Sequence, residues 1–210
     1  MKSMFLIYLL MMCLISCKGG SSGSDGDSAS NEAPEDNNSS CEQVGDECGG
    51  GLYAGKSSGI DLIITPSGCT DSNTPTCNGT TDIMTKRWNT TAYAGMPFAG
   101  GASATDGLAN TEAIFASTSA TAEAVSYCKN LDYGGFNDWY LPSMTEFVDV
   151  LNNTLSVAST FNLDTLEYWT STELTCGGGG TCGWAYKASM NGSSSTPKDT
   201  SLYIRCIRQL

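Results

Sequence analysis

Histidine is absent from all 210 residues of the chain. Its absence excludes Ser-His-Asp triads, Cys-His nucleophiles and histidine-ligated metal sites. Basic residues are scarce as well: Lys and Arg number 10 against 22 Asp and Glu, which gives a formal net charge of −12. Binding to nucleic acid rewards clustered cations, so the acidic balance argues against that class of protein. Solubility explains such a charge, with calcium or a cationic partner as the alternative.

A long apolar run is lacking at the N-terminus, because the run from Met4 to Ile15 is shorter than the about 20 residues that span a bilayer. This run fits the central part of an export signal. Its end, Leu14-Ile15-Ser16-Cys17, resembles the bacterial lipobox, which implies cleavage before Cys17 and acylation of that residue. We therefore expect residues 1–16 to be a lipoprotein signal peptide. Lys18 after the cysteine favours anchoring in the outer membrane, and an ordinary secreted protein is the alternative.

Apolar side chains are almost missing from residues 18–40, which are mostly Gly, Ser, Asp and Asn. Such a composition buries too little surface to fold. We expect residues 17–40 to form a lipidated, disordered linker that reaches roughly 25 Å from the membrane. Residues 41–210 then form one domain, with 17 acidic and 8 basic residues and a net charge of −9.

Pairs of the C-x-x-C type are absent too, which together with the lack of histidine disfavours zinc. Eight cysteines remain after Cys13 of the signal and Cys17 of the lipid site, and an even number in an exported domain predicts disulfides. Three pairs are close enough in sequence to close small loops, namely Cys41–Cys48, Cys69–Cys77 and Cys176–Cys182. The remaining pair is Cys128–Cys206, which joins a predicted helix to the last predicted strand.

The order of the expected elements predicts a single α+β domain with two helices packed on antiparallel strands. Strand patterns and helical patterns are distinguished by their β-branched content and their apolar spacing. Early strands are expected at 49–54 and 60–65, helices at 120–131 and 144–153, and late strands at 168–173, 183–189 and 202–208. Residues 90–111, rich in Gly, Ala and Thr, are expected to form an ordered loop.

The segment Gly134–Phe147 contains a glycine turn, a short aromatic stretch, a proline and the start of a helix. Ser143 and Glu146 have the S-x-x-E spacing of a capping box. Trp139 is expected in the core, and the same holds for Trp169. We interpret this segment as framework rather than as a site.

Two motifs suggest bound ions or nucleotides, and neither is complete. Residues Gly50–Ser57 satisfy the phosphate-loop pattern G-x-x-x-x-G-K-[ST], but no buried strand precedes them and no helix follows. The side chains of Asp106, Asp132, Asn137 and Asp138 supply oxygen ligands for calcium, yet none lies in the EF-hand frame. Calcium therefore stays an alternative, and no other cofactor is expected.

Aromatic residues outside the expected core are the candidate ligand contacts, since apolar sugar faces stack on rings. The candidates are Trp88, Tyr93, Trp184 and Tyr186, although composition favours a core position for each over a ligand contact. A pair of carboxylates would support glycoside hydrolysis instead, but no spacing singles out such a pair.

Three pieces carry a resemblance to a known family: residues 134–143, with Asn137-Asp138-Trp139-Tyr140-Leu141-Pro142; residues 168–172, Tyr-Trp-Thr-Ser-Thr; and residues 203–208, Tyr-Ile-Arg-Cys-Ile-Arg. In order and spacing they resemble a bacterial domain family typified by the C-terminal domain of the Legionella collagen-like adhesin. The resemblance covers most of residues 41–210. It departs from the family pattern at Tyr140, where arginine is usual.

The resemblance implies a C-type-lectin-like fold in which a disulfide joins a helix to the last strand, in agreement with Cys128–Cys206. It also implies extracellular display and ligand binding without catalysis, and it permits a homo-oligomer such as a trimer. We expect a non-enzymatic, lipid-anchored surface or periplasmic binding module, with a carbohydrate or a protein as ligand. The net charge of −9 argues against glycosaminoglycans. A structural envelope or matrix protein that binds another protein is the first alternative, and a secreted hydrolase is the second.

Overall fold

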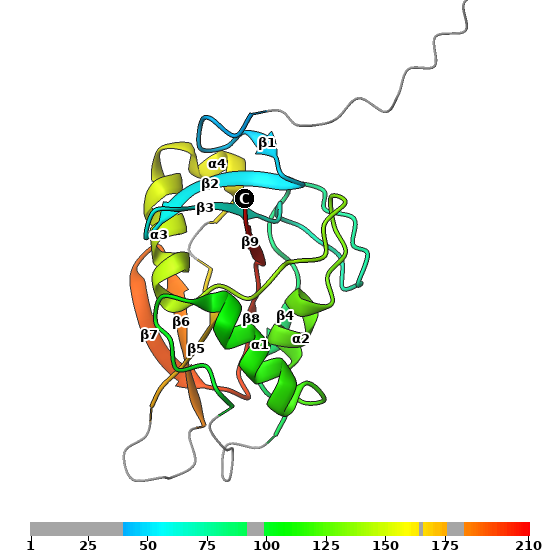
Figure 1. Cartoon of the computed structure of the whole chain (residues 1–210), viewed down its shortest axis with the longest axis vertical. Coiled ribbons are helices and arrows are strands. Elements are labelled where there is room, and N and C mark those ends of the chain that lie inside the picture. The colour runs from blue at the N-terminus through cyan, green and yellow to red at the C-terminus, as the bar shows by residue number, and fades with distance from the viewer. Residues whose placement is uncertain (1–39, 92–98, 164–165, 176–182) are drawn as a thin grey trace, which may run out of the picture. The chain divides into compact units, whose positions relative to one another are not determined.

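The computed structural model describes residues 40–91, 99–163, 166–175 and 183–210. These residues belong to one compact unit, Asn37–Leu210. The unit is an α+β domain with two sheets (Figure 1), as the sequence predicts. Within the described part of the chain, no helix has both the length and the apolar character needed to cross a membrane.

The first sheet holds the early strands. Its order is β1-β2-β3-β9, with β1 Glu47–Cys48, β2 Gly51–Ser57, β3 Ile60–Ile64 and β9 Ile207–Gln209. β2 and β3 form a hairpin whose turn, Ser58-Gly59, has positive φ at both residues. Both early strands are thereby confirmed. The phosphate-loop pattern at 50–57 forms a strand instead of a loop before a helix, and Lys56 pairs with Asp61 at 2.7 Å.

The second sheet has the order β4-β8-β5-β6-β7. Its strands are β4 Thr85–Arg87, β8 Ser201–Tyr203, β5 Tyr168–Glu173, β6 Trp184–Ser189 and β7 Gly192–Pro197. The late strands at 168–173 and 183–189 are confirmed as β5 and β6. The strands β4 and β7 were not predicted.

The prediction of one last strand at 202–208 is wrong. The C-terminal segment runs from β8 in one sheet to β9 in the other, as its red trace shows in Figure 1. Between the two strands, Arg205 and Cys206 are buried, and the Cys206 carbonyl accepts a hydrogen bond from the Thr65 amide at 3.0 Å. Both faces of this segment are covered, so a period of two in the sequence does not reveal the change of sheet.

The helices are α1 Gly107–Thr118, α2 Glu123–Lys129, α3 Met144–Thr154 and α4 Ala158–Phe161, with a 3-10 turn η1 at Leu155–Val157. The predictions of α2 and α3 are confirmed. The expected loop at 90–111 is wrong at its end, where α1 begins. The Asp106 side chain caps α1 by accepting from the Ala109 amide at 2.9 Å. The buried positions of α1 are mostly small or polar, so this helix lacks the apolar stripe that marks α3.

The capping box at the start of α3 is present in full. The Ser143 hydroxyl accepts from the Glu146 amide at 3.3 Å, and the Glu146 carboxylate accepts from the Ser143 amide at 2.7 Å. The same carboxylate accepts from the Gly107 amide at 2.9 Å. One side chain therefore satisfies amides at the N-termini of two helices, which orients α1 against α3.

Two hydrophobic clusters fill the domain on the two sides of β5. Trp169 belongs to the cluster that packs with α1 and α2, and Tyr168 belongs to the cluster that packs with α3 and the first sheet. All six residues of β5 are buried as a result. The second sheet is therefore central to the core.

Three predicted disulfides are present. They are Cys41–Cys48, Cys69–Cys77 and Cys128–Cys206, with Cα atoms 5.7, 3.9 and 5.4 Å apart. The third joins α2 to the segment between β8 and β9. The predicted Cys176–Cys182 pair lies outside the described residues. Because disulfides form and persist in oxidising compartments, the three bonds indicate an extracytoplasmic protein.

Candidate functional site

Trp88 is a core residue, and its proposed role as a ligand contact is wrong. Its side chain is fully buried, and its Nε1 donates to the Thr170 carbonyl of β5 at 2.9 Å. Trp139 and Trp169 are buried in the same way, as expected, with their indoles bonded to backbone carbonyls. The basic and aromatic composition of Lys86-Arg87-Trp88 suggests an exposed segment, but only the side chains of Lys86 and Arg87 are partly exposed.

Trp184 and Tyr186 lie on β6 and are both partly exposed. Tyr93 lies outside the described residues. Alternate residues of a strand point to one side, so the rings of Trp184 and Tyr186 share a face of the second sheet. In the register of β6 with β7, Trp184 is opposite Pro197 and Tyr186 is opposite Ser195. We call the surface of these four residues the aromatic face.

Both sides of β6 contribute to the framework. On the side of Trp184 and Tyr186, Ala188 is buried in the cluster that packs with α3. On the other side, Ala185 is buried in the cluster around Trp88, and Lys187 pairs with Glu167 at 2.5 Å. Strand β7 was missed in the sequence, and with it Ser195 and Pro197. The signal that predicts it is Asn191-Gly192, a pair typical of tight hairpin turns. Gly192 has φ +108 where the turn enters β7.

A buried ion pair holds the base of this hairpin. Lys198 follows β7 directly, and its Nζ bonds to the carboxylate of Glu173 at the end of β5, with both side chains fully buried. The Lys198 Nζ also lies 4.5 Å from the centre of the Trp88 ring. Burial lowers the pKa of Lys198, and the hydrogen bond to Glu173 opposes that shift.

The Glu173 carboxylate also gathers backbone amides. It accepts from the Gly101 amide at 2.7 Å and from the Ala99 amide at 2.9 Å. The Lys198 amide donates to the Gly183 carbonyl at 2.8 Å. This network fixes β5, β6 and the end of β7 relative to one another, so the aromatic face rests on a rigid base.

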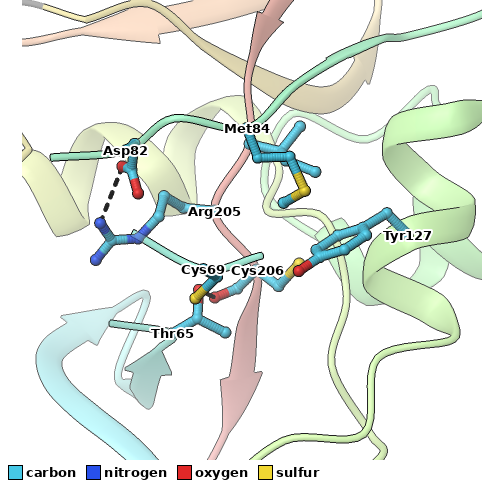
Figure 2. Close-up of a pocket in the computed structure, with 8 residues that line it drawn as sticks. Thr65, Cys69, Asp82, Met84, Tyr127, Arg205 and Cys206 are labelled. Carbon is cyan, nitrogen blue, oxygen red and sulfur yellow. Dashed lines mark hydrogen bonds and ion pairs between the residues drawn. The ribbon is translucent and has the colours of Figure 1, made fainter. Parts of the chain in front are cut away.

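A small cavity lies beside the Cys128–Cys206 disulfide (Figure 2). Its lining residues come from several segments and are Thr65, Cys69, Asp82, Met84, Tyr127, Ile204, Arg205 and Cys206. Figure 2 shows the guanidinium of Arg205 turned toward Asp82, to which its Nη1 donates at 3.0 Å. Asp82 also accepts from the Tyr168 hydroxyl at 2.8 Å and from the Gly68 amide at 3.1 Å.

The volume of this cavity, about 10 Å³, decides its role. Ligand pockets commonly measure roughly 300–1,000 Å³, whereas a single water molecule needs roughly 10–15 Å³. The cavity admits neither a sugar nor a peptide. The Arg205–Asp82 pair is therefore part of the framework that joins the two sheets.

Asp138 and Arg208, from two of the three signature pieces, form another framework pair. The Arg208 guanidinium donates through Nε and Nη2 to both carboxylate oxygens of Asp138, at 2.6 and 2.9 Å. It also stacks on the Phe136 ring, 3.8 Å from the ring centre. The segment 134–147 is thus fixed to β9, in agreement with its interpretation as framework.

Two of the four residues proposed as calcium ligands have structural roles. Asp106 caps α1 and Asp138 pairs with Arg208. In the described part of the chain, no group of three or more Cys, Asp or Glu is arranged to hold a metal ion. Burial raises the pKa of the Glu146 carboxyl, but hydrogen bonds from Tyr140, Ser143 and Gly107 account for this residue as a structural cap.

Comparison with known families gives a match over most of the domain. Residues 73–208 match the model of the Lcl C-terminal domain, and all three signature pieces lie within this range. The matched region excludes β1 to β3, which form most of the first sheet. No curated protein matches the chain.

Proposed function

Because the chain belongs to the Lcl C-terminal domain family, we propose that it is a non-enzymatic binding module whose ligand is a carbohydrate. The observation that carries this proposal is the aromatic face. Two neighbouring rings on a rigid strand, bordered by a hydroxyl and a proline, suit the apolar faces and the hydroxyl groups of sugars. The sheet holds the rings in place, so little conformational entropy is lost on binding.

A lipid on Cys17 completes the proposal. The lipobox at Leu14–Cys17 supports acylation, and the disulfides of the domain agree with export. Stable anchoring takes more than one acyl chain, and acylation at a lipobox cysteine attaches several. The module is then displayed on the bacterial cell envelope, at the outer membrane.

The lack of histidine supports binding without catalysis, since it removes the most common general base. Glu146 has the raised pKa that a general acid needs, but it lies buried between two helix N-termini. Its contacts serve folding, and the aromatic face carries no carboxylate.

The test is a titration of the unit Asn37–Leu210, which contains both hydrophobic clusters and the three disulfides and so carries its own core. Isothermal titration with a panel of soluble oligosaccharides is expected to give saturable binding. Trp184→Ala is expected to weaken it at least about tenfold, as for a central aromatic contact. Absence of binding to every glycan class would reject the proposal.

A protein partner is the second candidate, and the outer edge of β7 favours it. β7 pairs with β6 along six residues without a bulge, and Gly192, Ser193 and Ser194 are exposed. Uncharged edges of this kind accept an added strand from a partner. Crosslinking in whole cells that captures one specific protein at β7 residues would support this alternative over a glycan.

A further inference from the structure

The cations of the domain have a feature in common that bears on the charge of its ligand. All eight Lys and Arg of residues 41–210 lie in the described part of the chain, and each is ion-paired with its own carboxylate. The pairs are Lys56–Asp61, Lys86–Asp71, Arg87–Glu123, Lys129–Glu112, Lys187–Glu167, Lys198–Glu173, Arg205–Asp82 and Arg208–Asp138.

The most basic stretch of the surface illustrates the consequence. Lys86 lies 2.6 Å from a carboxylate oxygen of Asp71, and Arg87 lies 3.5 Å from one of Glu123. A sulfate or carboxylate group that approaches either cation also approaches its acidic partner. The local field is therefore close to neutral.

The remaining field of the domain is negative. With eight acids paired, the other nine of the 17 acidic residues account for the net charge of −9. An anionic polysaccharide would be repelled at distances up to about a Debye length, roughly 8 Å at physiological salt. Anionic ligands need unpaired cations to attract them, and the described surface has none.

The aromatic face fits this charge pattern. Its four residues, Trp184, Tyr186, Ser195 and Pro197, are all uncharged. The nearest cation along β6, Lys187, points to the opposite face and is paired with Glu167. Successive residues on one strand face are roughly 7 Å apart, so both rings can contact the same oligosaccharide.

We infer that the aromatic face selects uncharged glycans, such as oligomers of glucose, mannose or N-acetylglucosamine, and that ion pairing of every cation excludes sulfated and uronic-acid glycans. This inference rests on the proposed carbohydrate binding and names its ligand class. Stacking and hydroxyl contacts then supply the affinity, and charge pairing supplies the discrimination.

The experiment compares uncharged oligosaccharides with heparin and polygalacturonate on the unit Asn37–Leu210. Uncharged ligands are expected to bind with an affinity that changes little between about 0.05 and 0.5 M NaCl. Trp184→Ala and Tyr186→Ala should each weaken this binding at least about tenfold. Trp184→Phe should retain most of the binding because it keeps a ring, and Lys187→Ala should leave it unchanged because Lys187 is on the other face.

A second set of variants tests the role of pairing. Asp71→Asn with Glu123→Gln frees Lys86 and Arg87, and we expect heparin to bind roughly fivefold more tightly or better as a result. The matched control is Asp132→Asn with Asp199→Asn, which changes the net charge equally at two exposed acids outside the eight pairs. Only the first double variant should gain affinity beyond the small effect of net charge.

Each outcome has a distinct meaning. The inference would be overturned if the natural protein bound heparin, if this binding weakened with salt, and if it persisted in Trp184→Ala. The proposed carbohydrate binding would still hold in that case. Binding of uncharged glycans that ignores both aromatic substitutions would also overturn it. Absence of binding to any glycan would reject the proposed function itself.

Discussion

Trp139 is the residue that fixes the segment 134–147 in the core. Its side chain is 1% exposed, and its indole donates to the Phe136 carbonyl at 3.1 Å. We expect Trp139→Ala to lower the free energy of unfolding by roughly 3–5 kcal/mol, as for other large buried aromatics. Urea unfolding followed by circular dichroism measures this, with the surface variant Trp184→Ala as control. A stable Trp139→Ala domain that has lost its ligand would show that a site had been mistaken for core.

Glu146 makes stability depend on pH. Burial raises the pKa of its carboxyl above the value of 4.5 expected in the unfolded chain. The folded state therefore holds this proton more tightly, and the stability it contributes is complete below pH 4.5 and is lost as pH rises through the folded pKa. Gln in this position resembles the protonated form, because its oxygen can accept from the Ser143 and Gly107 amides. Its NH₂ can donate to the oxygen of the Tyr140 hydroxyl, which in the natural protein donates to Glu146.

We therefore expect the natural protein to lose stability relative to Glu146→Gln between about pH 4 and pH 7. Urea unfolding of both proteins at the two pH values gives the difference, and other titrating groups cancel in it. A difference that stays constant, or one that moves in favour of the natural protein at pH 7, would contradict a raised pKa.

At the scale of elements, the Cys128–Cys206 disulfide ties α2 to the segment that changes sheets. It closes a loop with a sequence separation of 78, against 7 for Cys41–Cys48. In the chain-entropy model these loops correspond to about 4.5 and about 2.5 kcal/mol. Replacing both cysteines of the long loop with alanine should thus cost clearly more unfolding free energy than replacing those of the short one. Equal losses in urea unfolding would rule out this ranking.

The sequence predicts those elements whose signals are local. The capping box of Ser143 and Glu146 defines the start of α3, and the isoleucines of β3 define a strand between turns. Helix α1 escaped prediction because it buries Gly107, Asn110 and Thr111, which fit between α3 and β5 without an apolar stripe. The division of 201–209 into β8 and β9 depends on how the two sheets separate, which no local pattern encodes.

The candidate site could be predicted only in part, because some of its residues come together only through strand pairing. The alternation of Trp184 and Tyr186 identifies one face of a strand, whereas the partners Ser195 and Pro197 depend on the pairing of β7. Trp88 remained a ligand candidate because its neighbours Lys86 and Arg87 are polar, whereas the fold turns Trp88 inward over β5. Pairing of every cation is likewise a property of the folded domain, since six of the eight partners lie more than 15 residues away in sequence.

At the scale of the whole molecule, the proposal joins an envelope anchor to a binding domain. Cys17→Ser removes the proposed acylation site and should release the protein from the membrane. Detergent phase partition of cells that produce the full chain measures this, and the natural protein is expected in the detergent phase and the variant in the aqueous phase. Equal partition of both into the detergent phase would contradict anchoring through Cys17.

The most direct test of the account uses the four tryptophans of the chain as reporters. Trp88, Trp139 and Trp169 are fully buried, whereas Trp184 is partly exposed on the aromatic face. The measurement is the set of indole N–H signals in a ¹H–¹⁵N NMR spectrum, recorded during titration with an uncharged oligosaccharide. We predict that the Trp184 signal moves and saturates while the other three stay in place. A ligand that binds without moving the Trp184 signal would contradict the aromatic face as the site.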